Sequence, residues 1–175
     1  MQPKKYEIKQ GVTLHVIKTN KFKTDLTGIF LTFPISKENV TINTLIPAIL
    51  KRGSQNLKTQ EEINKTLEEM YGATFDCGID KTGDNHVIRF YIESINSSFL
   101  PNNERNISSA LYTLLEIVFN PYTENGVFKE EYVNGEKNNI EQLINSKIDA
   151  KEQYALDKTI EKMYDSMPYG LYKYG

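Results

Sequence analysis

Residues 59–93 of the chain read TQEEINKTLEEMYGATFDCGIDKTGDNHVIRFYIE, and this stretch decides the fold class. Its first part predicts a helix, because Thr59 and Glu62 form a capping box and a stripe of apolar side chains at helical spacing precedes Gly72. Its second part alternates apolar and polar residues on either side of Lys81–Asp84, which indicates two antiparallel strands joined by a turn. A helix followed directly by a hairpin favours an α+β protein over a doubly wound α/β one.

The segments on either side extend the same pattern. Alternating apolar residues indicate strands at 11–17 and 25–34, and apolar residues at helical spacing indicate a buried helix at 41–52. A further helix precedes Asn120 and Pro121, which stop it. The strict alternation of strand and helix that builds a parallel sheet is missing, so we expect an antiparallel sheet with helices packed on one face.

The last third of the chain is predicted to be helical and then irregular. From Val127 onwards the apolar spacing indicates one long helix or two in tandem, with Gly135 as the weak point, since glycine costs about 1 kcal/mol relative to alanine. The final segment, Met167–Gly175, carries turn residues and three tyrosines, and we expect it neither to cap nor to close the fold. Residues 1–175 are therefore expected to form the incomplete front part of a longer protein.

Composition excludes several classes of protein. The chain has 175 residues, 39% of them hydrophobic and 25% charged, which is typical of a globular domain rather than a disordered one. Its 21 Lys and Arg against 23 Asp and Glu give no basic field for nucleic acid. Apolar runs such as Ile46–Leu50 are far too short to cross a membrane, and Met1–Glu7 turns polar where a secretory signal needs an apolar run. We expect a cytoplasmic protein with neither nucleic acid nor membrane as a partner.

Few residues offer catalytic chemistry. The sequence has no glycine-rich phosphate loop, no Gly-x-Ser-x-Gly, no Cys-x-x-Cys and no His-x-x-x-His. Its single cysteine, Cys77, is expected to be a small buried hydrophobe. The two histidines, His15 and His86, lie on separate predicted strands that could meet across a sheet. A zinc site built from them with Asp76 or Asp84 stays open as one alternative.

The order of these elements nevertheless resembles a known family. The opening half-domain of the pitrilysin/insulinase zinc peptidases, which include mitochondrial processing peptidase, has similar landmarks in the same order. The matching segments are Gly11–Leu14 with the strand after it, Ile49–Ser54, Leu67–Ala73, Phe119–Pro121, Phe128–Glu131, Glu136-Lys137 and Met167–Gly170. The resemblance implies an α+β domain that is half of a two-domain insulinase-type subunit, with a second homologous domain beyond residue 175.

The catalytic motif of that family is absent. Its members carry His-x-x-Glu-His on the helix before the Lys/Arg-Gly-Ser/Thr turn, where two histidines one turn apart share a zinc ion and the glutamate acts as general base. The corresponding stretch here is Thr44-Leu45-Ile46-Pro47-Ala48, so Thr44 and Ala48 replace the histidines and Pro47 replaces the base. The position of the third ligand, a glutamate in the family, falls on or next to Leu143. We therefore expect no catalytic residue, no metal ligand and no cofactor in this chain.

This departure resembles the non-catalytic subunits of the family, and most of all the inactive Firmicutes subunit that is linked by name to modification of elongation factor P. The segments that carry this resemblance are Gly11–Thr13, Lys18–Thr24, Leu45–Pro47 and Glu69–Gly72. It implies a heterodimer with an active zinc peptidase homologue, which alone would hold zinc, and a role in binding peptide or protein substrate. An extended peptide can add to a sheet edge without any metal. A scaffold or binding module unrelated to proteolysis is the other alternative.

Overall fold

The computed structural model describes residues 3–101 and 104–175, so residues 1 and 2 of the polar N-terminal segment and residues 102 and 103 of the polar stretch at 96–106 lie outside the description. The elements, in chain order, are β1 (Lys4–Lys9), β2 (Val12–Val16), β3 (Thr24–Pro34), α1 (Val40–Leu50), α2 (Gln60–Glu69), β4 (Thr74–Thr82), β5 (Asn85–Ile95), η1 (Ser97–Phe99), α3 (Asn106–Phe119), α4 (Glu130–Ser146), η3 (Lys147–Asp149), α5 (Lys151–Met163) and η4 (Pro168–Gly170).

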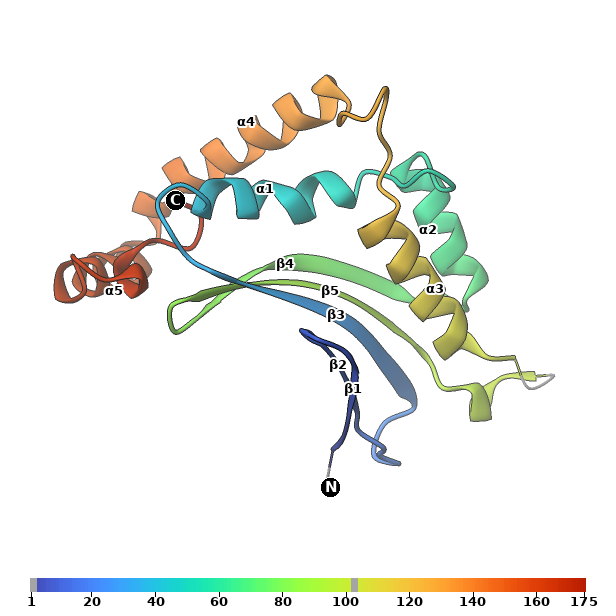
Figure 1. Cartoon of the computed structure of the whole chain (residues 1–175). Helices are drawn as coiled ribbons and strands as arrows, with labels where there is room; N and C mark the ends of the chain where they lie inside the picture. The colour runs from blue at the N-terminus through green and yellow to red at the C-terminus, as the bar shows by residue number, and fades with distance from the viewer. Residues whose placement is uncertain (1–2, 102–103) are drawn as a thin grey trace.

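The predicted hairpin forms the centre of an antiparallel sheet. Strands β4 and β5 are joined by a two-residue turn, in which Gly83 has a φ of 56° that glycine adopts at little cost. β3 pairs with the other side of β5, so the strand order is β3-β5-β4 and β5 is central. Helices α1, α2 and α3 cover one face of this sheet, and α4 lies over α1 (Figure 1). The predicted α+β class, with helices on one face of an antiparallel sheet, is confirmed.

The hydrophobic core lies between this sheet and the helices. Ile88, Phe90 and Ile92 on β5 are fully buried, and apolar residues of α2 and α3 pack against them. Helix α2 begins as predicted, since the Thr59 side chain accepts a hydrogen bond from the Glu62 amide at 3.2 Å. It ends at Glu69, and the chain then leaves the helix through two left-handed residues, Tyr71 with a φ of 61° and the predicted Gly72 with a φ of 74°.

The structure differs from the sequence-based expectations in two details. Residues 4–9, for which no element was predicted, form β1, which pairs with β2 in a separate two-stranded sheet. The long helix does divide into α4 and α5, but the break is at 147–150 and not at Gly135, which lies within α4. The break allows Lys147 to pair with Asp157 at 3.2 Å, so tertiary contacts outweigh helix propensity there.

Candidate functional site

The positions that match the zinc motif of the family lie on α1, between the sheet and α4. Thr44 is buried, and its hydroxyl is 2.9 Å from the carbonyl oxygen of Val40, one turn back on the same helix. Ala48 offers only a methyl group. Neither side chain can donate an electron pair to zinc as an imidazole does.

Pro47, at the position of the general base, lies inside α1 and is buried. Proline has no side chain that could take a proton from water, and it lacks the N–H that would donate to the carbonyl of Asn43. Its own carbonyl oxygen accepts from the Lys51 amide at 3.2 Å and lies 3.4 Å from Sγ of Cys77 on β4. Residues 44–48, which match the zinc motif, therefore pack α1 against β4.

The buried carboxylate on the helix that carries the third-ligand position is already engaged. Glu136, on α4, is 3% exposed and accepts from Nε of Arg52 at 2.6 Å. Its second oxygen accepts from the amide group of Asn139 at 3.2 Å. Leu143, two turns further along α4, is 46% exposed and has no ligating atom. The ion pair fastens the C-terminal end of α1 to α4, a contact that the spacing in the sequence does not reveal.

Strand β4 is an edge of the three-stranded sheet, and α1 packs against it. Cys77 lies on its inner face, partly buried, and burial raises the pKa of the thiol to about 11. The thiol is therefore protonated at neutral pH and is a poor nucleophile, as expected for a small hydrophobic residue. On the outer face of the strand, Arg89 of β5 pairs with Asp80, and the hydroxyl of Tyr91 donates to Asp76 at 2.9 Å.

The structure does not assemble the displaced zinc site. His15 is exposed on β2, whereas His86 is fully buried on β5, in the other sheet. Asp76 points to the opposite face of the sheet from His86, because their strand positions alternate in burial. Within residues 3–101 and 104–175, no three His, Cys, Asp or Glu side chains are grouped so that they could hold a metal ion. These residues do not fit zinc.

The segment Pro168–Gly175, which we call the strap, lies against the start of α1. Its Lys173 carbonyl oxygen is 3.2 Å from the hydroxyl of Thr44, and Tyr174 packs against the hydrophobic core. The expectation that this end of the chain neither caps nor closes the fold is therefore wrong. The sequence analysis noted its three tyrosines, but their spacing does not predict this contact. The strap covers the position of the first histidine of the motif.

Comparisons with known proteins agree with this geometry. No family model matches the chain. It is 33% identical over 165 residues to the probable inactive metalloprotease YmfF of Bacillus subtilis (strain 168), a match that covers 94% of this chain and 39% of that protein. A conserved protein from Enterococcus faecalis V583 superposes with a TM-score of 0.90 at 27% identity, over 99% of this chain and 41% of that one.

A second solved structure decides the fold. The peptidase M16 inactive domain from Pseudomonas fluorescens superposes with a TM-score of 0.70 at 16% identity, over 100% of this chain and 39% of that one. The chain has the fold of the matching part of that domain. It spans about two fifths of the length of the relatives that it matches. In the part of the chain that the structure describes, no helix is both long and apolar enough to span a bilayer.

Proposed function

We propose that the chain is part of a non-catalytic, peptidase-like subunit that pairs with an active zinc peptidase homologue and binds peptide or protein substrate. One observation carries the proposal: the motif positions hold a hydroxyl, a proline ring and a methyl group in a packed contact between α1, β4 and α4. The nearby carboxylate of Glu136 is bound by Arg52. The similarity to the probable inactive metalloprotease of Bacillus subtilis supports the same interpretation.

Peptide binding in this proposal uses the free edge of β4. Among the residues that the structure describes, the strand pairs with β5 on one side only, so its other side offers main-chain groups to an extended segment. Alternate side chains on the outer face, Asp76 and Asp80, already interact with Arg89, and they give this edge a defined pattern of charge. Main-chain pairing would supply affinity and this pattern would supply selectivity.

The proposal also covers the whole protein. The relatives are more than twice as long as this chain, so we assign residues 1–175 to most of a first insulinase-type domain and expect a second homologous domain in the complete subunit. The link to modification of elongation factor P rests on the resemblance of the sequence. A cytoplasmic location is part of the same proposal.

Coexpression with an active homologue that carries His-x-x-Glu-His tests the proposal. We expect the full-length protein to co-elute with it as a 1:1 complex containing one zinc ion, and a peptide substrate to protect the amides of β4 from hydrogen exchange. A protein that stays monomeric in the presence of the homologue would favour the scaffold module. Stoichiometric zinc with chelator-sensitive cleavage by the protein alone would contradict a non-catalytic role.

A further inference from the structure

The charge of the chain is divided unevenly along its length. Residues 4–23, which we call the basic arm, hold six lysines and one glutamate, a formal charge of +5, whereas the whole chain has a net charge of −2. The rest of the chain therefore carries −7. The balanced total of the composition hides this asymmetry, which favours a charged partner for the arm.

The basic arm stands apart from the three-stranded sheet. Its strands β1 and β2 form a sheet of their own and pack mainly on each other, on the side of the larger sheet away from the helices (Figure 1). A ribbon of two strands is at best marginally stable alone in water. Among the residues that the structure describes, both strands have a free edge, so either can pair with a further strand.

The basic arm also exposes large apolar side chains. Tyr6 lies opposite Leu14 across the two strands, and these side chains are 47% and 48% exposed. Phe22, in the segment that leads to β3, is 66% exposed. The other exposed apolar residues of the arm are Ile8, Val12 and Ile17. Apolar side chains gathered on a projecting element mark a surface for interaction.

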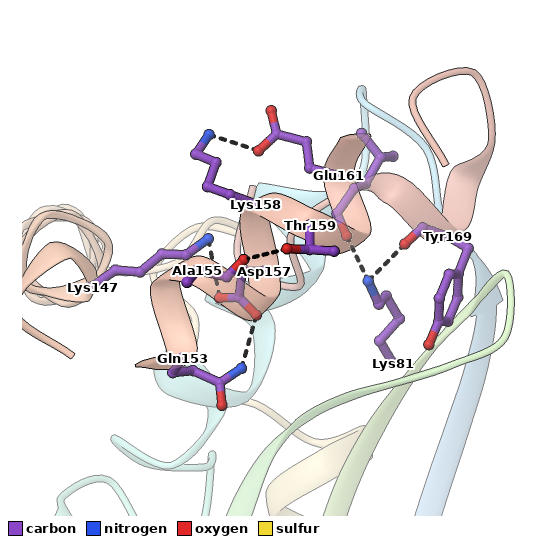
Figure 2. A network of polar contacts seen from close by, with 10 residues as sticks. Lys81, Lys147, Gln153, Ala155, Asp157, Lys158, Thr159, Glu161 and Tyr169 are labelled. Carbon is purple, nitrogen blue, oxygen red and sulfur yellow. Dashed lines mark hydrogen bonds and ion pairs between the residues drawn. The ribbon is translucent and has the colours of Figure 1, made fainter. Parts of the chain in front are cut away.

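The charge of the arm is not compensated within the described part of the chain. All of its lysines are exposed and none forms an ion pair there; they are Lys4, Lys5, Lys9, Lys18, Lys21 and Lys23. Figure 2 shows lysines of the body that are engaged instead. Lys81 donates from Nζ to the carbonyl oxygen of Tyr169 at 2.8 Å, and Lys147 pairs with Asp157 at 3.2 Å. The arm therefore offers its lysines to a partner.

These features fit an acidic protein surface better than a membrane or a nucleic acid. A ribbon with two open edges does not enter the hydrocarbon of a bilayer, because its main-chain groups would lose their hydrogen bonds to water. Phosphates would neutralise the lysines but leave the apolar side chains in water. A protein with a free strand edge among carboxylates can pair with the ribbon, cover its apolar side chains and neutralise its charge.

We propose that the basic arm docks the active zinc peptidase homologue, through an acidic surface of that homologue that carries a free strand edge. The inference rests on the proposed pairing and names the surface of this chain that makes it. The edge of β4, assigned to peptide, belongs to the other sheet. Docking and peptide binding therefore use different surfaces, and each can be lost without the other.

Charge reversal in the arm of the full-length protein tests the proposal. The variant Lys4→Glu/Lys5→Glu/Lys9→Glu reverses three charges on β1, and Lys65→Glu/Lys151→Glu/Lys162→Glu reverses three at exposed positions of α2 and α5 as the control. Biolayer interferometry on the immobilised homologue measures Kd. We expect the arm variant to bind at least about tenfold more weakly than the wild type, and the control to stay within about twofold. The Kd of the wild type should rise with salt more steeply than that of the arm variant.

A second arm variant, Lys18→Glu/Lys21→Glu/Lys23→Glu, lies outside the two strands, so its effect does not depend on the stability of the ribbon. We expect it to weaken binding as well. Hydrogen exchange of β1 and β2 should be slower in the complex than in the full-length protein alone, and exchange of β5 reports whether the domain of each variant is folded.

Unchanged affinity in both arm variants overturns the docking site and leaves the pairing intact. An arm already protected in the full-length protein alone also overturns it, since another part of the same chain then covers the arm. So do arm variants that lose binding only to phosphatidylglycerol vesicles or to a DNA duplex, because the lysines then serve those partners. A wild-type protein that does not bind the homologue overturns the pairing itself, and the docking site with it.

Discussion

The two faces of the three-stranded sheet both carry large apolar side chains, but the surroundings of these side chains are opposite. On the inner face Ile88, Phe90 and Ile92 are each 0% exposed beneath the helices. On the outer face of the same sheet Leu26 and Phe30 of β3 are 64% and 61% exposed. Alternation in the sequence marks the two faces of a strand, but it does not say which face the helices cover. The apolar side chains of β3 are therefore buried or exposed according to whether the helices cover their face of the sheet.

The largest expected effect on the free energy of unfolding comes from replacing one phenylalanine on each face by alanine. Phe90→Ala should lower the free energy of unfolding by about 3–5 kcal/mol, because it removes a fully buried ring and leaves a cavity. Phe30→Ala, one register position away on the neighbouring strand, should change it by less than about 0.5 kcal/mol. Urea denaturation measures both values. Equal costs would mean that the outer face is covered in solution, and the contrast between the faces would fail.

The next effect concerns the ion pair that fastens the helix layer. Arg52→Met leaves the carboxylate of Glu136 buried without its cation, and we expect a loss of about 2 kcal/mol, reduced because Arg52 is itself partly exposed. The double variant Arg52→Met/Glu136→Met should recover most of this loss. Lys129→Met is the matched control, since its partner Glu131 is exposed, and it should cost less than about 0.5 kcal/mol. A double variant as unstable as the single one would show that the charge of Glu136 is not the cause.

The smallest expected effect is a pH dependence of the inner face. Burial lowers the pKa of His86 from 6.5, the main chain of Lys173 opposes this shift, and the nearby positive charge of Lys81 adds to it. The unfolded chain therefore binds the proton more readily, so the contribution of His86 to stability is complete above pH 6.5 and is lost as the pH falls below it. We expect a loss of about 1 kcal/mol between pH 7.5 and 5.5 that is absent in His86→Leu and present in His15→Gln. An unchanged slope in His86→Leu would assign the pH dependence to other groups.

The sequence predicted the sheet and its helices where local signals agree with tertiary packing. Thr59, Glu62 and the turn at Gly83 each specify their conformation through neighbouring residues, and the structure confirms them. The break between α4 and α5 has no glycine or proline, since it follows from the contacts that Lys147 makes with residues far along the chain. Such contacts leave no local pattern to detect.

The candidate site was predictable in its chemistry but not in its surroundings. Residue types at 44, 47 and 48 were enough to predict the loss of the zinc motif, because neither proline nor alanine can replace its glutamate or histidine. The engagement of Glu136 by Arg52 and the covering of Thr44 by the strap depend on side chains brought together over long separations. The resemblance to a family identified the motif positions, and only the structure showed which residues contact the side chains near them.

Because Cys77 contacts Pro47 of α1, the reactivity of its thiol can report local opening between α1 and β4. The thiolate is the reactive form, and burial raises the thiol pKa to about 11, so a disulfide reagent will label Cys77 slowly in the folded chain and faster when α1 and β4 separate. Because the chain has one cysteine, the labelling rate follows this one site without any introduced probe. Peptide addition at β4 should alter that rate, and the native sequence allows the event to be timed.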